Sequence, residues 1–570
     1  MASFESRVQT IGVDLLAKTR GERPGLFSGE RWTAEVLEWA MKDPDFKTEL
    51  FRLVDVYPVL DTTEAVSRHV EEYLLKPGLG GPAVIRLALK GAGWTGFTAR
   101  IAASQIGRNL SKMAERFIAG ETPELAVPTL ANLRSSGMAF SVDLLGETVV
   151  GAREAASYAT RVQSALETLA AAAATWRADP RLDADDRGPI PRVNLSVKLS
   201  ALESQLAAVS HDRSVALGAA ALLPIFRRAR ALGASVNVDM EHVATKDIII
   251  GAFEAALAHP DLDGWSDGAI AIQAYLKSAD EDVQGLVTFA KKSKRSFTVR
   301  LVKGAYWDSE TALARREGWP VPVWSQKAET DACFERCLDR LIDAHPRVRT
   351  AVGSHNVRSL AVAIALAEQA KLPKAALEFQ SLYGMAEPVR SALLASGHRL
   401  RVYAPVGELI PGMAYLVRRL LENTSNAGWL RLGFVEGRKP EELLARPAVT
   451  PAPKAADSAK VALAFANEPL RDFTLPAARA SVQKALLALT PDSATPVIGG
   501  VAQPTGRTIE RRDPSDGKTL VGTVHLGTLA QADHAVATAL AAFPVWSAAS
   551  ADARAARLDA FATRLRAAKD

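Results

Sequence analysis

The feature that most constrains the fold is an alternation of short β-rich runs with longer helical segments, which begins at Phe140. Eight such runs follow one another, each with a helical pattern after it: 140–144, 192–198, 235–239, 269–273, 297–303, 348–352, 376–380 and 399–403. Alternating strands and helices imply a parallel sheet, and eight repeats favour a closed barrel over an open sheet. We therefore predict an α/β protein built around a (β/α)8 barrel over residues 137–430.

Barrels of this kind carry their chemistry at the carboxyl ends of the strands. Each predicted strand ends in polar or ionisable residues: Asp143 and Glu147, Lys198, Asp239 and Glu241, Gln273, Arg300 and Lys303, His355 and Asn356, Gln380, and Tyr403. Any one of them has an ordinary structural explanation, such as a helix cap or a solvated tip. A single shared pocket explains all eight positions together.

The fifth run leads into a segment of unusual composition. Residues 297–303 alternate between apolar and polar, and Gly304, Tyr306 and Trp307 follow directly. A strand that feeds into charged, glycine and aromatic residues is typical of side-chain delivery into a site. The alternative is a core strand whose two aromatic residues plug one end of the barrel.

The barrel has different sequence on either side. Residues 1–136 show helical periodicity, with helices expected at 30–41, 46–57, 62–75 and 98–118. Residues 91–96 match G-x-G-x-x-G, but repeated strand–helix units are missing around them and bulky Trp94 would crowd a phosphate, which argues against a dinucleotide site. Residues 431–490 are rich in Pro and Ala and are predicted to be a linker.

Composition excludes several classes of protein. The chain has 570 residues, 48% apolar and 23% charged, with a net charge of +5. It is long enough for two or more domains. Its basic residues are interleaved with acidic ones, which argues against nucleic acid as a partner. The small positive net charge is compatible with weak attraction to an anionic membrane surface. Cys333 and Cys337, the two cysteines, are expected to be reduced thiols packed in a helix. Without a signal-peptide pattern or a spanning apolar run, we expect a cytoplasmic location.

A helical segment near the end of the repeats carries paired arginines. Helical spacing places Tyr415, Arg418, Arg419 and Glu422 on neighbouring positions of residues 412–423. A helix of this kind at a barrel mouth would offer a guanidinium clamp for a carboxylate. On spacing alone, a solvated pair with an Arg418–Glu422 salt bridge explains the pattern equally well.

Four motifs together resemble a known family. Residues 300–308, 378–380, 403–407 and 415–423 are similar to the proline dehydrogenase domain of the bacterial bifunctional flavoenzyme proline utilization A, and the resemblance covers about residues 30–430. It implies FAD-dependent oxidation of L-proline to 1-pyrroline-5-carboxylate, by hydride transfer from proline C5 to flavin N5, as the first step of proline catabolism to glutamate. It also implies that the last barrel helix lies above the barrel mouth.

The resemblance implies a role for each matching residue. The proline carboxylate would bind Lys198, Arg418 and Arg419. The ring would be enclosed by Tyr306, Leu382, Tyr403 and Tyr415, with Asp239 and Glu422 on the polar side and a gating ion pair between Arg418 and Glu147. FAD would be held by Gln273, Arg300, Val302, Gly304, Trp307, His355, Asn356 and Gln380, with Ser325 and Lys327 as further contacts.

The same resemblance suggests what surrounds the barrel. Residues 491–570 look like the incomplete start of an aldehyde dehydrogenase domain, which in the full family oxidises glutamate semialdehyde with NAD. The resemblance implies that the nucleophilic cysteine of that domain lies further on, and neither Cys333 nor Cys337 can replace it because both fall inside the barrel. We therefore expect only the first half-reaction from this chain. A membrane quinone, reached by peripheral association, is the expected electron acceptor. We find no basic strand–helix–helix pattern before residue 30 that would suggest a DNA-binding module.

Two other classes of function remain as alternatives. The first is a flavin-free barrel aldolase that forms a Schiff base on Lys198 or Lys303, which requires a lysine of lowered pKa. It predicts trapping by borohydride and no yellow colour. The second is a non-catalytic scaffold, which predicts neither colour nor turnover.

Overall fold

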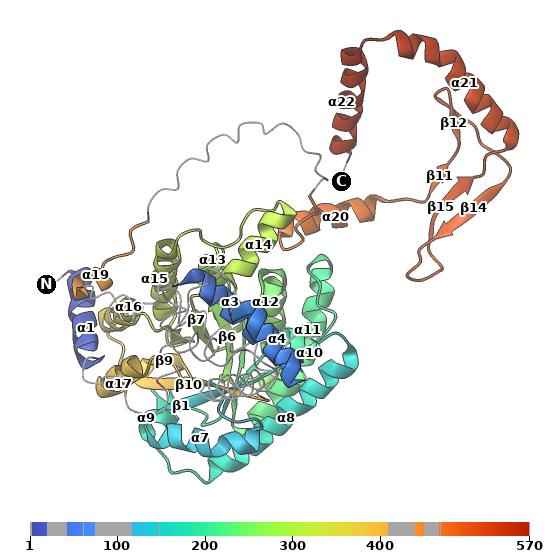
Figure 1. Ribbon diagram of the computed structural model, residues 1–570. Helices are drawn as coiled ribbons and strands as arrows, with labels where there is room; N and C mark the ends of the chain where they lie inside the picture. Colours follow the sequence, from blue (N-terminus) through green and yellow to red (C-terminus); the bar gives the residue numbers. More distant parts are fainter. Residues whose placement is uncertain are drawn as a thin grey trace. The chain divides into compact units, whose positions relative to one another are not determined.

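The computed structural model describes residues 3–19, 43–60, 62–74, 117–146, 149–408, 439–449, 467 and 469–568. The chain divides into two compact units, residues 1–470 and residues 471–570 (Figure 1).

The first unit contains a closed barrel of eight parallel strands in the order β1-β10-β9-β8-β7-β6-β5-β4. The strands are β1 (Ala139–Leu144), β4 (Asn194–Val197), β5 (Ser235–Val238), β6 (Gly268–Gln273), β7 (Phe297–Val302), β8 (Val348–Gly353), β9 (Leu377–Leu382) and β10 (Arg399–Val406). All eight predicted runs form these strands, and β1 closes the ring by pairing with both β10 and β4. The predicted (β/α)8 barrel is confirmed.

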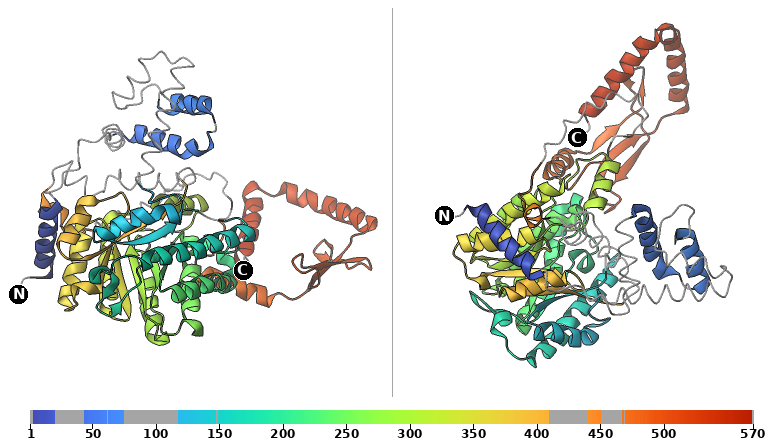
Figure 2. Two further views of the ribbon diagram at one scale, coloured as in Figure 1. Left: turned by 90° about the horizontal axis from the view of Figure 1, so that it is seen from below. Right: turned by 60° about the vertical axis from the view of Figure 1, so that its left-hand side comes forward.

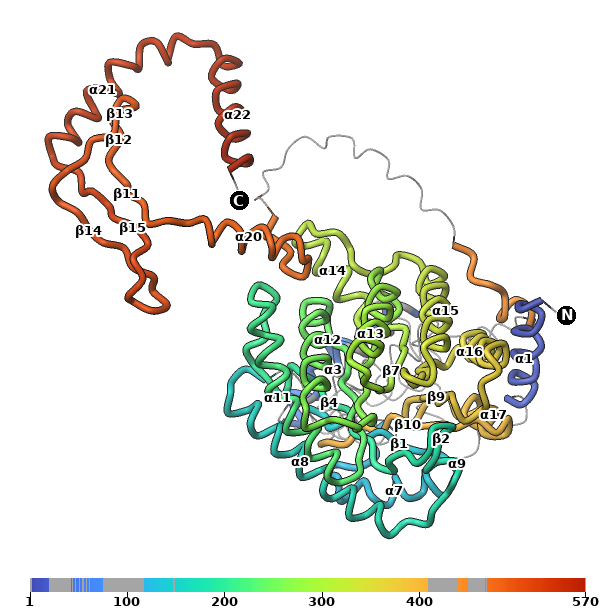
Figure 3. The backbone as a smooth tube through the Cα atoms, turned by 180° about the vertical axis from the view of Figure 1, so that it is seen from behind, coloured from blue at the N-terminus to red at the C-terminus, as the bar shows by residue number. Residues whose placement is uncertain are grey.

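Helices surround the barrel on its outer side, as the tube in Figure 3 shows from behind. The main ones are α8 (Ala152–Ala174), α11 (His211–Leu232), α12 (Val243–Leu257), α13 (Ala279–Ser293), α14 (Trp307–Glu317), α15 (Lys327–Asp343), α16 (Val357–Gln369) and α17 (Glu387–Ala395). Cys333 and Cys337 are free thiols buried on α15, as predicted. The short helices α9 (Pro180–Asp183) and α10 (Leu199–Leu202) and the hairpin of β2 (Ala184–Asp185) with β3 (Gly188–Pro189) lie in the connections.

Apolar and polar residues alternate along the strands because the two sides of the barrel wall face different environments. On β5, Val236 and Val238 are fully buried in the hydrophobic core between strands and helices. The alternate residue Asn237 faces polar groups, since its side-chain amide donates to Asp239. Parallel barrels usually fill their interior with branched apolar residues. Here polar side chains enter the barrel interior from several strands, so hydrogen-bonding and charged groups lie along the barrel axis.

Helices also precede the barrel. They are α1 (Phe4–Thr19), α3 (Pro44–Val56), α4 (Thr63–Leu74) and α7 (Pro123–Ser135), with a 3-10 turn η1 (Tyr57–Val59). The helices expected at 46–57 and 62–75 are confirmed as α3 and α4, which pack on each other. The helices expected at 30–41 and 98–118 lie wholly or almost wholly outside the described residues, as does the glycine motif at 91–96. Helix α1 buries Val8, Ile11 and Leu15 and packs against α16 and α17.

The second unit contains a small sheet and three helices, drawn in orange to red in Figure 2. Its sheet has the order β11-β15-β14, with β11 (Asp492–Ala494), β14 (Thr508–Arg512) and β15 (Leu520–His525), and a hairpin joins β12 (Val497–Ile498) to β13 (Val501–Ala502). The helices are α20 (Pro476–Ala488), α21 (Leu529–Ala548) and α22 (Ala551–Ala567). Large apolar side chains on α21 and α22 are exposed, among them Leu540, Phe543 and Phe561. Within the described ranges, none of the helices is long and apolar enough to cross a bilayer.

Candidate active site

Asp239, directly after β5, organises the polar groups at the carboxyl ends of the strands. Its Oδ1 accepts hydrogen bonds from Arg300 Nη1 at 2.7 Å and from Asn237 Nδ2 at 2.8 Å. Its Oδ2 accepts from the Tyr403 hydroxyl at 2.7 Å. Burial raises the pKa of Asp239, and the positive charge of Arg300 counteracts part of this shift. Three predicted site residues from β5, β7 and β10 are thus brought together.

Arg300 crosses the interior of the barrel from β7. Its Nη2 donates to Ser196 Oγ at 3.1 Å and lies 3.3 Å from Ser141 Oγ, on β4 and β1. The guanidinium carbon lies 5.1 Å from the centre of the Tyr403 ring. The Arg300 side chain is buried, and its Nε has no hydrogen-bond partner among the residues described. Among the described residues, one donor of this buried guanidinium is therefore unused.

Lys198 and Asp143 form a second polar group at the same end. Lys198 Nζ lies 2.6 Å from Asp143 Oδ1, and the two side chains are 14% and 1% exposed. Burial alone would lower the lysine pKa, but Asp143, Tyr158 and Asp239 together raise the pKa of Lys198 above its usual value. Lys198 is therefore a fixed ammonium, suited to binding an anion and unsuited to nucleophilic attack.

Gln273, the last residue of β6, provides an unused acceptor. Its Nε2 donates to the Met240 carbonyl at 2.9 Å, whereas its Oε1 is buried and has no partner in the part of the chain that the structure describes. A buried polar atom without a partner costs about 1–3 kcal/mol, and a bound group that supplies the partner is one way to remove this cost. Unused donor and acceptor atoms on Arg300 and Gln273 fit a polar heteroaromatic ring such as a flavin.

The turn after β7 holds the predicted glycine and aromatic residues. Gly304 has a φ of +122°, and a Cβ there would lie 2.4 Å from the Tyr275 ring, so only glycine fits. The ring of Tyr306 lies 4.3 Å from that of His242. Trp307 begins α14, is 40% exposed, and donates from Nε1 to the Trp324 carbonyl at 2.7 Å. The turn is tightly packed at Gly304, while the Trp307 side chain is partly exposed to solvent.

The amino ends of α15 and α16 gather the remaining cofactor candidates. Lys303 pairs with Asp331 Oδ1, and Lys327, the first residue of α15, lies 2.6 Å from Asp331 Oδ2. Burial lowers the pKa of Lys303 to about 8, although Asp331 opposes the shift. Ser325 donates to Glu329 at 3.0 Å. Two lysines beside a helix amino end form an environment that favours phosphate groups.

His355 and Asn356 immediately precede α16. Asn356 Oδ1 accepts from the Ser359 backbone amide at 3.1 Å, so Asn356 is the N-cap of the helix. His355 Nε2 accepts from the backbone amide of Leu382 at 3.3 Å. This contact joins a predicted cofactor residue to a predicted substrate residue at the end of β9. Val302 packs nearby, since a Cβ on Gly353 would lie 2.8 Å from its Cγ1.

Gln380 lies on β9 in register with Gly353, which itself pairs with Val302 of β7. Its Nε2 donates to Glu378 Oε1 at 2.7 Å. Arg401 binds the same carboxylate through Nε at 2.7 Å and Nη2 at 2.9 Å. Although burial alone would raise it, Arg401 and Arg399 lower the pKa of Glu378 to about 2. Gln380 lines a cavity of about 40 Å³ that Arg300 and Asn237 also line.

Five predicted site residues lie outside the described residues: Glu147, Tyr415, Arg418, Arg419 and Glu422. The predicted arginine clamp, the gating pair and the placement of the last helix above the mouth therefore stay predictions. The described residues bring together Lys198, Asp239, Arg300 and Tyr403, with Tyr158 close enough to influence the pKa of Lys198.

Sequence reasoning missed the partners of these residues. Ser141, Ser196 and Asn237 each stand two positions before a predicted strand-end residue, so the two-residue period of a strand could have identified them. His242 and Glu310 were also missed. Buried Glu310 accepts from the Val243 amide at 2.9 Å and lies 3.1 Å from His242 Nδ1. No local pattern in the sequence indicates that contact.

Comparison with known families identifies three matching regions. The family model described as "Proline dehydrogenase" matches residues 126–432. The "Proline utilization A N-terminal domain" matches residues 5–117, and the "Aldehyde dehydrogenase family" matches residues 501–570.

Individual proteins are similar over these regions. The bifunctional protein PutA of Escherichia coli K12 is 30% identical over 78% of this chain and 34% of its own length. Proline dehydrogenase 1 of Bacillus subtilis 168 is 27% identical over 57% of this chain and 91% of its own length. The crystal structure of proline utilization A from Bdellovibrio bacteriovorus, inactivated by N-propargylglycine, has a TM-score of 0.87 and 39% identity over 99% of this chain and 57% of that one. The chain thus spans about a third of the length of the curated bifunctional relatives.

Proposed function

The chain belongs to the proline dehydrogenase family, and we propose that its barrel oxidises L-proline to 1-pyrroline-5-carboxylate with FAD as cofactor. The observation that carries this proposal is the barrel mouth itself. A fixed ammonium on Lys198 stands near the Asp239–Arg300–Tyr403 network, and the unused polar atoms of Arg300 and Gln273 lie in the same barrel. The arrangement offers a cation for a carboxylate and partners for a flavin ring.

Lys198 would bind the substrate carboxylate. Its charge is secured by Asp143, and Arg418 and Arg419 are proposed to complete the clamp. Tyr306, Leu382, Tyr403 and Tyr415 would enclose the ring, and Asp239 and Glu422 would form the polar side. A small ring held at one end by its carboxylate has little freedom left, so its C5 can be presented in one orientation. The Arg418–Glu147 ion pair would close the pocket.

FAD would be held along two sides of the mouth. Gln273, Arg300, Val302, Gly304 and Trp307 would contact its flavin side. The amino ends of α15 and α16 would hold its phosphates through Ser325, Lys327, His355 and Asn356, and Gln380 on β9 would be a further contact. When bound, FAD supplies the acceptor for the hydride that leaves proline C5. If FAD binds there, the fixed positive charge of Arg300 would stabilise the negative charge of a reduced flavin.

The proline nitrogen must also lose a proton. Both oxygens of Asp239 already accept hydrogen bonds, from Arg300, Asn237 and Tyr403, which makes this carboxylate a weak candidate for the base. Lys198 is held protonated by its neighbours. We therefore assign the proton to solvent.

A quinone is the proposed electron acceptor, reached by peripheral contact with a membrane from the cytoplasm. The support for this acceptor is the family resemblance alone. We propose no NAD-dependent oxidation of glutamate semialdehyde by residues 471–570, because both cysteines of the chain lie on α15 of the barrel.

The test is product formation. Purified chain, L-proline and a soluble quinone should yield a cyclic imine, which 2-aminobenzaldehyde traps as a coloured adduct. The Schiff-base aldolase remains as a rival because the lowered pKa of Lys303, about 8, would suit a nucleophile. Inactivation by borohydride in the presence of a keto acid, together with no imine from proline, would favour that rival.

A further inference from the structure

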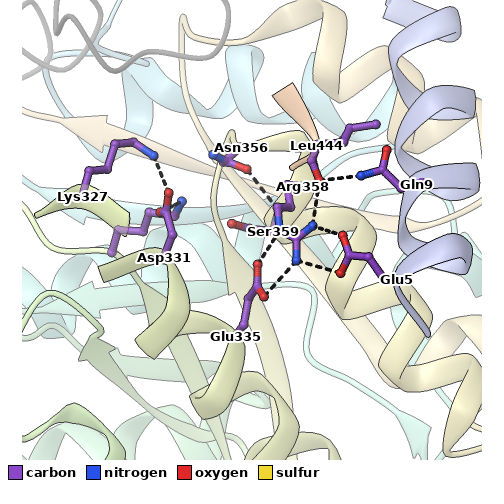
Figure 4. Close-up of polar contacts among 10 residues, drawn as sticks. Glu5, Gln9, Lys327, Asp331, Glu335, Asn356, Arg358, Ser359 and Leu444 are labelled. Atoms are coloured by element: carbon purple, nitrogen blue, oxygen red, sulfur yellow. Dashed lines mark hydrogen bonds and ion pairs between the residues drawn. The ribbon is translucent and has the colours of Figure 1, made fainter. Parts of the chain in front are cut away.

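Arg358, in the first turn of α16, joins three separate elements through one buried guanidinium (Figure 4). Its Nη1 and Nη2 contact the Glu5 carboxylate of α1 at 2.5 and 3.2 Å. Its Nε and Nη2 contact the Glu335 carboxylate of α15 at 2.8 and 3.2 Å. Nη1 also donates to the Leu444 carbonyl at 2.7 Å. The Arg358 side chain is only 6% exposed.

The segment at Leu444 follows the short helix α19 (Pro440–Leu443) and is itself fixed by α1. Gln9 Nε2 donates to the same Leu444 carbonyl at 2.8 Å. The Leu444 side chain is fully buried against Gly12, where a Cβ would lie 2.4 Å from Leu444 Cδ2. Arg358, α1 and residue 444 therefore form one packed unit.

This unit lies beside the amino ends of two barrel helices. Arg358 stands two residues after Asn356, the N-cap of α16, and three after His355. Its partner Glu335 stands eight residues after Lys327, about two turns along α15. The Glu5–Arg358–Glu335 contacts thus tie the first turn of α16 to a position about two turns into α15, and both helices begin at proposed cofactor contacts.

Arg358 lies buried between two carboxylates, and removal of either one replaces a bidentate, charge-assisted contact of its guanidinium by a weaker one. Two bidentate contacts also fix the direction of the guanidinium, and with it the relative position of α15 and α16. Sub-ångström changes in that position would reach the cofactor contacts, since helices move as rigid elements.

We propose that Arg358 is a positioning residue for the cofactor, and that helix α1, through Glu5, forms part of the support of the cofactor site. The proposal rests on the proposed binding of FAD. It assigns a role in cofactor retention to a helix that begins more than 350 residues before α16 in the sequence.

The chain offers a matched control. Arg7 of α1 also binds α16, through Nε and Nη2 to Glu368 at 2.7 and 2.8 Å. This pair docks the same two helices, but Glu368 is ten residues from Arg358, about 15 Å along the axis and at the other end of α16. If loss of a contact only loosened α1, disruption of the Arg7–Glu368 pair and of the Glu5–Arg358 pair would affect FAD release equally. If Arg358 positions the cofactor site, disruption of the Glu5–Arg358 pair alone should affect it.

The experiment compares Glu5→Gln, Glu335→Gln and Arg7→Gln in the full chain loaded with FAD. The rate of FAD release is followed by the rise in flavin fluorescence, and thermal unfolding of the FAD-free protein reports stability. We expect release to become about threefold to tenfold faster in Glu5→Gln and Glu335→Gln, and to stay within about twofold in Arg7→Gln.

Equal release rates in Glu5→Gln and Arg7→Gln would overturn the inference, whether both change or neither does. A wild-type chain that binds no FAD would instead overturn the proposed function, and this inference with it. The two failures are thus distinguishable from the wild-type control alone.

Discussion

At the scale of the residue, the barrel mouth depends on charges whose partners come from distant strands. Asp239 accepts from residues on β5, β7 and β10, and Arg300 reaches serines on β1 and β4. The inward direction of these side chains follows from strand alternation and was predictable. Their pairing was not, because it depends on how the strands align around the ring, and Arg300 is 159 residues from Ser141.

The charge of Lys198 provides a first prediction. In Asp143→Asn the ammonium loses its main anionic neighbour, so the raised pKa of Lys198 should fall. A five-membered-ring carboxylate without the nitrogen is the right probe, because it carries no titrating amine. Its inhibition constant should be constant from pH 6 to 10 in the wild type and should rise within this range in the variant. Asp280→Asn, which alters an exposed pair with Arg340, is the control. Parallel pH profiles in all three proteins would contradict the role of Asp143.

Glu378 provides a second prediction, which concerns stability. Its folded-state pKa of about 2 lies below the ordinary 4.5, so its ionised form stabilises the fold above pH 4.5. This stabilisation is lost as the pH falls from 4.5 toward 2. Glu378→Gln leaves Arg401 and Arg399 without their anion and should cost about 3–5 kcal/mol in urea unfolding at pH 7.

The same variant should lose part of the acid sensitivity. Between pH 5 and 3, the free energy of unfolding should fall less steeply in Glu378→Gln than in the wild type. Glu167→Gln, which removes an exposed partner of Arg228, should cost about 1 kcal/mol or less. Equal costs for the two variants would show that the Glu378 network does not stabilise the barrel.

At the scale of the element, the positions of helices could be predicted from their periodicity, but the elements against which they pack could not. The expected helices at 46–57 and 62–75 match α3 and α4 to within two residues. The docking of α1 on α16 and α17 was not predicted, because an amphipathic pattern shows that a helix has a buried face without indicating which element covers it. Glu5 and Arg358, 353 residues apart, illustrate the limit.

Two variants of Asn356, the N-cap of α16, can distinguish its structural role from its proposed role in cofactor binding. Asn356→Ala removes the cap and should cost about 1 kcal/mol of stability, and it should also weaken FAD binding. Asn356→Ser retains a capping oxygen, so stability should be kept while FAD affinity falls. Thermal unfolding of the FAD-free protein and flavin titration measure the two effects. Unchanged FAD affinity in Asn356→Ser would show that Asn356 only caps the helix and does not contact the cofactor.

At the scale of the whole molecule, the chain consists of two compact units. The first contains the barrel and the proposed site. The second exposes Leu540, Phe543, Trp546 and Phe561 on its helices, which is typical of surfaces that are covered by further protein.

A chain that ends at residue 470 should therefore retain proline oxidation. It should bind FAD as the full chain does, because Pro469 and Leu470 still pack at Gly318 and Trp319. Removal of residues 471–570 should also lower the fluorescence of a hydrophobic dye added to the protein. Loss of proline turnover in a folded short chain would show that the second unit contributes to the site.

The visible absorption spectrum of the purified chain, recorded without oxygen before and after L-proline, tests the central claim most directly. We predict the bands of oxidised flavin, bleached by L-proline and left unchanged in Lys198→Met at the same proline concentration. A protein that stays colourless after FAD is supplied, or a yellow protein whose bands do not respond to L-proline, would contradict the account.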